Sequence, residues 1–218
     1  MSYKEIREDK EIAELIKKGD EILGALGYTD HSQEHCLLVA EHASDILKQL
    51  GYKKKEIELV KIAAYMHDIG NAINRNQHAE YGALLANDIL KNYDISIKDR
   101  ITIVSAIANH DESTGGASDL ISAALIIADK TDVRRNRVRK KPKASFDVHD
   151  RVNYAVTKTD LIINKEKKYI TLDLEIDEKI CTMYEYFEIF LGRMMMCRKA
   201  AELLGMTFKL VVNGNKAL

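Results

Sequence analysis

Six histidine and aspartate side chains occur where apolar segments begin or end, and their types suit the binding of metal ions. In chain order they are His35, His67, Asp68, His78, His110 and Asp129. Imidazole nitrogens and carboxylate oxygens are ligands of zinc, iron, manganese and similar ions. Burying such groups together without a cation would carry a heavy desolvation cost. Taken singly, each residue is more typical of a helix cap or a satisfied core histidine, but the set as a whole predicts a metal centre.

A centre of this composition could hydrolyse a phosphoester. A metal ion bound by histidine and aspartate lowers the pKa of a bound water molecule and so supplies hydroxide near neutral pH. Two ions about 3.5–4 Å apart can stabilise both the attacking and the leaving oxygen of a phosphoryl displacement. Asp68 lies in the middle of the set and has two carboxylate oxygens, so it is the candidate bridge. The neighbouring His67 would bind one ion only.

The segments that must position these residues read as helices. The spacing of apolar residues predicts helices over residues 4–26, 32–50, 55–68, 77–90, 96–110 and 120–131. The single proline, Pro142, and the scarcity of glycine-rich stretches before residue 110 agree with this prediction. The candidate ligands fall at the ends of these helices, and helix ends on one side of a bundle can bring such groups together.

The pattern changes in the last third of the chain. Residues 169–177 alternate apolar and polar side chains, as a half-buried strand does, and the preceding DLIIN and KEKK indicate a hairpin. A long helix is predicted over residues 178–204, followed by a last strand, TFKLVV. We therefore expect a mainly α fold. It would have a helical metal-binding domain over residues 1–143 and, packed on it, a small α+β appendage over residues 144–218. In the appendage the long helix would accompany an antiparallel sheet.

Five short motifs resemble those of a known family. HCLLVAEHA, AAYMHDIGN, HAEYGALLA, IANHD and IIADKTDVRR resemble, in this order, the successive motifs of the HD-domain metal-dependent phosphohydrolases over residues 30–137. The resemblance implies an HD-domain helical bundle in which the core metal ligands are His35, His67, Asp68 and Asp129. It also implies a second ion on His78 and His110, with Asp68 as the bridge.

Within that superfamily the motifs are most similar to two groups: the HD-type hydrolases of diadenosine tetraphosphate and the HD-GYP cyclic-dinucleotide phosphodiesterases. The chain departs from the HD-GYP pattern at three points. Asn71 stands where those proteins usually carry lysine, Asp111 stands where they carry a second histidine, and DESTGGASD contains no GYP motif.

The resemblance implies hydrolysis of a phosphoester or phosphoanhydride bond of a nucleotide or dinucleotide through a metal-bound hydroxide, with Asp68 and His67 as catalytic residues. Nitrogen and oxygen ligands accept iron, manganese, zinc, nickel or cobalt, and magnesium is also compatible. Two divalent ions are expected. All six candidate ligands are present, which favours an enzyme over a non-catalytic metal or nucleotide sensor. A diiron oxygenase is a third alternative, since HD-fold inositol oxygenase uses the same ligand set.

Basic residues after Asp129 could bind the substrate. In the resembling families an arginine six residues after this aspartate recurs, so Arg135 is the first candidate, followed by Lys130 and Arg134. Arginine suits bidentate contact with phosphate. His31, four residues before His35, could share its helix face and touch substrate as well. His149 and Asp150 repeat the His-Asp dipeptide, but their polar flanks favour a structural or surface role.

Composition excludes several function classes. The chain has 33 basic and 34 acidic residues and a net charge of −1, so no overall field indicates a nucleic-acid or membrane partner. The seven basic residues from Arg134 to Lys143 lack interleaved aromatic residues, which also argues against nucleic acid. Three scattered cysteines, without a CxxC pair or a signal-peptide pattern, predict a reduced, cytoplasmic protein. A small-molecule partner is expected, and the methionine-rich C-terminal helix is compatible with a homodimer.

Overall fold

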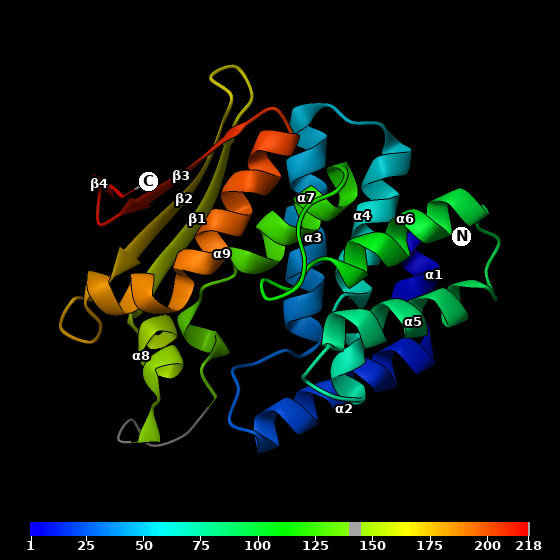
Figure 1. Ribbon diagram of the computed structural model, residues 1–218, viewed down its shortest axis with the longest axis horizontal. Coiled ribbons are helices and arrows are strands. Elements are labelled where there is room, and N and C mark those ends of the chain that lie inside the picture. The colour runs from blue at the N-terminus through cyan, green and yellow to red at the C-terminus, as the bar shows by residue number, and fades with distance from the viewer. Residues whose placement is uncertain (140–144, 218) are drawn as a thin grey trace.

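Helices fill one end of the molecule, and a four-stranded sheet with a long helix fills the other (Figure 1). The computed structural model describes residues 1–139 and 145–217. The predicted domain boundary at residue 143, Pro142 and the end of the basic run therefore lie outside the described residues. The helices before that gap are α1 (Tyr3–Arg7), α2 (Lys10–Ala25), α3 (Gln33–Leu50), α4 (Lys54–Met66), η1 (Ile69–Ala72), α5 (His78–Leu90), α6 (Ile97–Ala108), α7 (Leu120–Lys130) and η2 (Arg135–Arg137).

The predicted helices are confirmed to within a few residues, apart from the first. The stretch expected to be one helix over residues 4–26 is broken into α1 and α2. Asp9 explains the break: its side chain accepts hydrogen bonds from the backbone N–H groups of Glu11 and Ile12 and so caps the start of α2.

Helix α7 forms the centre of the core. Its segment LISAALIIADK is apolar on nearly every side, and its residues from Ile121 to Ala128 are buried. A helix that is apolar all round must be surrounded by protein. Accordingly α7 packs against α3, α4 and α6 on one side and against the long C-terminal helix α9 (Met183–Leu203) on the other. It therefore joins the helical body to the C-terminal part of the chain.

The C-terminal part consists of α8 (Val148–Ala155), β1 (Val156–Asn164), β2 (Tyr169–Ile176), α9, β3 (Thr207–Val212) and β4 (Asn215–Lys216). The strand order is β1-β2-β3-β4, and β1 and β2 form the expected antiparallel hairpin. The expectation of an antiparallel sheet is corrected at the next pair, because β2 and β3 run parallel. Helix α9 connects them and returns the chain to the end of the sheet at which β2 starts. Parallel strands require a crossover connection of this kind.

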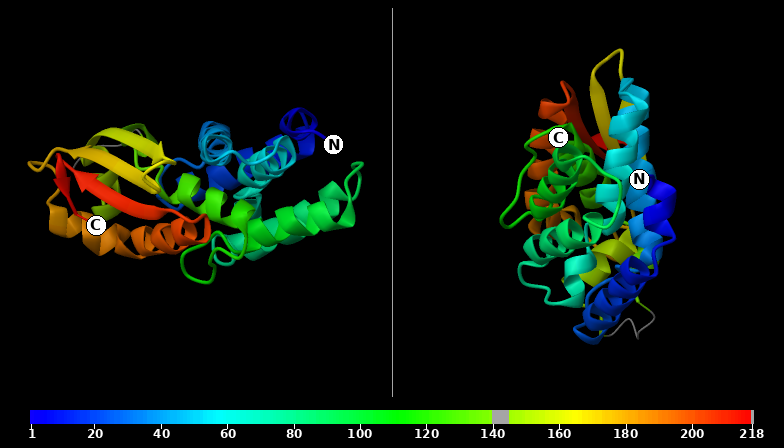
Figure 2. Two further views of the ribbon diagram at one scale, coloured as in Figure 1. Left: turned by 90° about the horizontal axis from the view of Figure 1, so that it is seen from above. Right: turned by 90° about the vertical axis from the view of Figure 1, so that its right-hand side faces the viewer.

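Helix α9 lies along one face of the sheet, as Figure 2 shows from above, and packs against β3. The alternation in β2 is confirmed, since Ile170, Leu172 and Leu174 are fully buried. Helix α9 begins at Met183 rather than at residue 178, because Thr182 and Glu185 form a capping box there. The mainly helical fold with a C-terminal sheet and one long helix is therefore confirmed, with a mixed sheet.

Candidate metal centre

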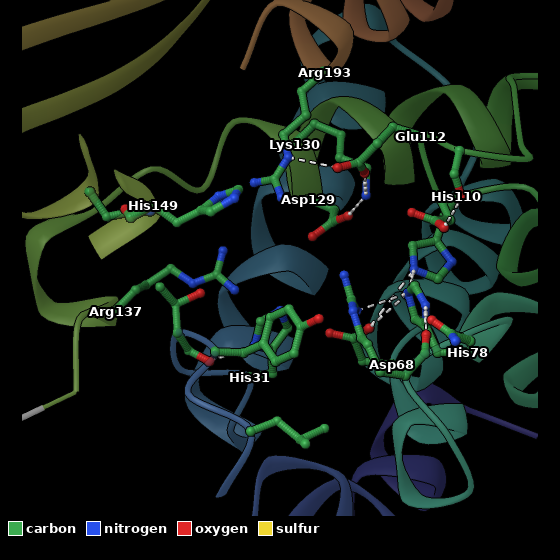
Figure 3. A pocket seen from close by; sticks show the side chains of 18 of the residues that line it. His31, Asp68, His78, His110, Glu112, Asp129, Lys130, Arg137, His149 and Arg193 are labelled. Atoms are coloured by element: carbon green, nitrogen blue, oxygen red, sulfur yellow. Dashed lines mark hydrogen bonds and ion pairs between the residues drawn. The ribbon is translucent and has the colours of Figure 1, made fainter. Parts of the chain in front are cut away.

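Four histidine rings meet where four helices begin or end. His35 lies in the first turn of α3, His67 directly after α4, His78 at the start of α5 and His110 just after α6. The ring centroids lie 5.3 Å apart for His35 and His67, 4.9 Å for His67 and His110, and 5.0 Å for His78 and His110. Together with Asp68 and Asp129 these residues form one group, which we call the His/Asp cluster; Figure 3 labels its members Asp68, His78, His110 and Asp129. The structure therefore brings all six sequence-predicted ligand candidates together.

The carboxylate of Asp68 lies between two pairs of imidazoles. Its Oδ2 is 3.2 Å from Nε2 of His67 and 3.8 Å from Nε2 of His35. Its Oδ1 is 3.6 Å from Nε2 of His78 and 3.8 Å from Nε2 of His110. One carboxylate therefore presents a different oxygen to each pair.

Asp129 faces the first of these pairs. Its Oδ1 lies 3.4 Å from Nε2 of His35 and 3.6 Å from Nε2 of His67. His35, His67 and Asp129 can be combined so that their ligand atoms all lie within 4.8 Å of one another, and the same holds for His67, Asp68 and His110. Both triples have the spacing that a metal ion needs.

Hydrogen bonds set the orientation of each imidazole. Nδ1 of His67, His110 and His78 donates to the backbone oxygens of Ala64, Ile107 and Arg75, at 2.7, 2.7 and 3.2 Å. A carbonyl oxygen can only accept, so Nδ1 carries a proton and Nε2 is the nitrogen that faces the cluster. Metal-binding histidines are held in this way.

Two of these nitrogens are buried without a partner. Within residues 1–139 and 145–217, Nε2 of His35 and Nε2 of His67 have no hydrogen-bond partner. Native proteins rarely leave a buried polar atom unpaired unless a ligand or ion completes it. The donor set and these orphaned atoms therefore fit a cation.

The charges of the cluster also suit a cation. Burial alone would raise the pKa of Asp68, but His67 holds it well below its usual range. Burial would likewise raise the pKa of Asp129, which Lys130 and the nearby histidines hold well below its usual range. Burial lowers the pKa of His67, yet Asp68 and Asp129 outweigh this effect and raise it to about 10. Two ionised carboxylates are therefore buried close together, and positive charge beside them stabilises this arrangement.

A close backbone contact places His78 opposite Asp68. After Asp68 the chain turns through η1, and Gly70 lies against the start of α5. A Cβ atom on Gly70 would lie 2.0 Å from the carbonyl oxygen of His78 and 2.4 Å from the backbone nitrogen of Gly82. Only glycine allows this approach. In the same turn Asn71 donates from Nδ2 to Oδ1 of Asp68 at 2.9 Å, so the residue at the HD-GYP lysine position holds the bridging candidate.

A cavity of about 670 Å³ opens onto the cluster. His31 and Lys130, two of the candidate substrate-binding residues named from the sequence, line it. Arg134 and Arg135 are not among the described residues that line it. Arg134 forms an ion pair with Asp132, and Arg135 donates to the backbone oxygen of Tyr154 at 2.6 Å and lies over its ring.

Several residues of this region were not singled out from the sequence. Arg137, rather than Arg135, reaches the cavity, because two residues along a 3-10 helix point in different directions. Asp132 is fully enclosed and bonds His35, and its position three residues after Asp129 was the available signal. His149, an exposed residue for which a structural or surface role was expected, also lines the cavity and points into it (Figure 3). Arg193 comes from α9, and no local motif marks it.

Comparison with known proteins agrees with this geometry. The HD domain family matches residues 33–150, more than half of the chain, and the chain belongs to this family. Family membership together with the complete His/Asp cluster makes it a predicted hydrolase of the HD superfamily.

Among the known proteins that are similar to the chain are two curated proteins and a solved structure. An uncharacterized protein of Methanocaldococcus jannaschii is 28% identical over 190 residues, which cover 77% of this chain and 73% of that protein. Ribonuclease Y of Enterococcus faecalis is 32% identical over 140 residues, covering 61% of this chain but 24% of that enzyme. The crystal structure of a predicted HD superfamily hydrolase from an uncultured Thermotogales bacterium aligns with a TM-score of 0.46 at 23% identity, covering 57% of this chain and 68% of that one. No helix among the described residues is long and apolar enough to cross a membrane.

Proposed function

We propose that this chain is a metal-dependent phosphohydrolase that holds two divalent ions on the His/Asp cluster and hydrolyses a phosphoester or phosphoanhydride bond of a nucleotide or dinucleotide. The observation that carries the proposal is the position of Asp68, whose two oxygens face two different pairs of histidine nitrogens. A bridging carboxylate between two ions needs this arrangement. The inward-facing Nε2 atoms supply the remaining ligands.

In this proposal the first ion is held by His35, His67, Asp129 and Oδ2 of Asp68. The second is held by His78, His110 and Oδ1 of Asp68. The mixture of nitrogen and oxygen ligands suits iron, manganese, zinc, nickel or cobalt. When bound, such ions lower the pKa of coordinated water and neutralise charge on a reacting phosphate.

The remaining cavity residues would bind and orient the substrate. Lys130 lies beside Asp129, with Nζ 2.8 Å from its Oδ2, so an ammonium group adjoins the cluster where phosphate oxygens would arrive. A volume of about 670 Å³ is within the usual range for sites that take a molecule of nucleotide size. Leu26 and Tyr28 on the cavity wall offer apolar surface for a base. We also propose that residues 144–218 form an appendage that completes this cavity.

Basic side chains on the cavity wall support a phosphate-bearing substrate over the neutral substrate of an oxygenase. Arg75, Lys130, Arg137 and Arg193 all line the cavity. Ribonuclease Y, whose name denotes cleavage of RNA, supports a phosphodiester as one substrate class. Diadenosine tetraphosphate, cyclic dinucleotides and short RNA are therefore the first compounds to test, followed by nucleoside mono-, di- and triphosphates.

The test combines metal analysis with turnover. The purified chain, loaded separately with manganese, iron, zinc, nickel or cobalt, is expected to bind two ions and to release phosphate or nucleotide from at least one compound of the panel. Asp68→Ala should abolish turnover, whereas Asp45→Ala removes an exposed carboxylate of α3 and should not. Absence of turnover at full metal occupancy, or equal turnover by Asp68→Ala and wild type, would overturn the proposal. Oxygen consumption by the iron-loaded protein would point to an oxygenase.

A further inference from the structure

The wall of the cavity beside Asp129 is completed by helix α9, outside the segment that matches the HD family. Arg193 of α9 reaches this wall next to Lys130, and His149 of α8 points toward the same space (Figure 3). The family match ends at residue 150, so Arg193 lies beyond it. Whatever Arg193 contributes therefore belongs to the C-terminal part of this chain.

A chain of ion pairs connects Arg193 to the His/Asp cluster. Lys130 Nζ lies 2.8 Å from Oδ2 of Asp129 and 2.8 Å from Oε2 of Glu112. The other oxygen of Glu112 accepts from Nε of Arg193 at 2.9 Å. Lys130 is only 6% exposed, whereas the side chains of Arg193 and Glu112 are 25% and 30% exposed. The ion pairs therefore lead from the buried His/Asp cluster to the open part of the cavity wall.

Arg193 is oriented but not saturated. Its guanidinium carbon lies 4.8 Å from the centre of the Phe190 ring, which supports the plane of the group. The Nε hydrogen is taken by Glu112, while neither terminal nitrogen has a hydrogen-bond partner in the described part of the chain. Two terminal nitrogens held in a plane at a cavity wall match the geometry of a phosphate group.

The ion-paired side chains of this corner balance one another. Lys130 and Arg193 carry two positive charges, and Glu112 and Asp129 carry two negative charges. Ions bound at the His/Asp cluster, as proposed above, would draw on the charge of Asp129 and so leave Lys130 and Arg193 available to an anionic group of the substrate.

We propose that Arg193 is a specificity-determining residue that binds a second phosphate group of the substrate, next to the phosphate at the His/Asp cluster. The substrate class is then a nucleoside diphosphate, a nucleoside polyphosphate or a dinucleotide joined through more than one phosphate, rather than a monophosphate ester. This inference rests on the proposed phosphohydrolase function and refines its substrate. The cavity is far larger than one phosphate group and has room for both.

The experiment compares two ligands that differ by one phosphate. Binding of adenosine monophosphate and of its non-hydrolysable α,β-methylene diphosphate analogue to the manganese-loaded protein is measured by titration calorimetry. Wild type is expected to bind the diphosphate analogue at least tenfold more tightly. Arg193→Gln should weaken binding of the analogue by about 10–100-fold, as expected for loss of a charged bidentate contact, and change the binding of the monophosphate less than twofold.

Two further variants separate this role from a structural one. Arg198→Gln removes the same charge from an exposed position of α9, where Arg198 pairs with Glu202, and should change neither affinity. Arg193→Lys keeps the positive charge beside Glu112 but loses the two terminal N–H groups of the guanidinium. It should weaken the binding of the diphosphate analogue only. Bound manganese is measured for every variant to verify the cluster.

Equal binding of the two ligands by wild type would overturn the inference, as would an equal loss of both ligands in Arg193→Gln and Arg193→Lys at full metal content. If Arg193→Gln does not fold, the inference is tested by the ratio of the two ligand affinities in wild type and by the affinities of Arg193→Lys. Failure of the proposed function gives a different result, because the whole substrate panel is then untouched by metal-loaded wild type. If wild type turns over compounds of the panel but shows no preference for a second phosphate, the role of Arg193 is refuted and the proposed function stands.

Discussion

Nδ1 of His35 lies 2.7 Å from Oδ2 of Asp132, and the two residues are separated by 97 positions in the chain. Both side chains are fully buried. The same carboxylate accepts a hydrogen bond from Arg134 and adjoins the guanidinium of Arg137, which hold it in place. His35 therefore donates a hydrogen bond from Nδ1 to Asp132, and its Nε2 faces Asp68 and Asp129.

Asp132→Asn should weaken metal binding without removing a ligand. The neutral amide is a poorer acceptor for the imidazole N–H, and loss of such a supporting contact typically costs about 10–100-fold in metal affinity. Competition with a chelator measures the change. Asp45→Asn removes a carboxylate from an exposed ion pair of α3 and should leave the affinity unaltered. Equal affinities for Asp132→Asn and wild type would contradict the positioning role.

His110→Gln should reduce the number of bound ions from two to one. In the proposed arrangement His110 serves only the ion that His78 also holds, because its Nε2 lies 3.2 Å from that of His78. Metal content is measured by mass spectrometry after equilibration with manganese. His42→Gln, which changes a histidine of α3 outside the cavity, is the control. Two ions retained by His110→Gln would refute the assignment of the second ion.

Gly70→Ala should destabilise the fold and separate η1 from α5. The added methyl group would lie 2.0 Å from the carbonyl oxygen of His78. Relieving this clash would require a shift of the backbone of η1 or of α5. We expect a loss of about 1–3 kcal/mol or more in the free energy of unfolding, the usual range for overpacking. Gly192→Ala in the exposed middle of α9 meets nothing within 4 Å and should stabilise the protein by roughly 0.5–1 kcal/mol. Chemical denaturation distinguishes the two, and a Gly70→Ala variant as stable as wild type would count against this contact.

Asp9→Ala should cost stability only where Asp9 is ionised. Burial opposes ionisation, but hydrogen bonds from Tyr93 and from the backbone of Ile12 and Glu11 hold the pKa of Asp9 below its usual value. A carboxyl whose pKa is lower in the folded state contributes stability above its unfolded pKa of about 4, and this contribution is lost as the pH falls through the folded pKa.

At pH 7 the loss of the cap in Asp9→Ala should therefore be about 1 kcal/mol. The difference from wild type should shrink in acid, as followed by urea denaturation across pH. Tyr93→Phe should reproduce part of the loss, since the Tyr93 hydroxyl donates to Asp9. A difference that is independent of pH would contradict the role of the ionised carboxylate.

Local sequence determined much of this protein. Helix starts and ends follow from short-range periodicity and capping, and the six His/Asp residues could be selected because each stands at such an end. The strand alternation in β2 was equally local, since it depends on the period of two in side-chain direction. His31 and Lys130 line the cavity because each is next to, or one turn from, a residue of the cluster.

Tertiary structure decided how these pieces meet. The opposed oxygens of Asp68, the bond of His35 to Asp132 and the entry of Arg193 from α9 depend on contacts between distant segments. Arg135 lies away from the cavity because the direction of a side chain in η2 depends on how that turn packs on α8. The parallel pairing of β2 and β3 likewise follows from where α9 returns the chain. Periodicity records which face of a segment is buried, but not which other segment buries it.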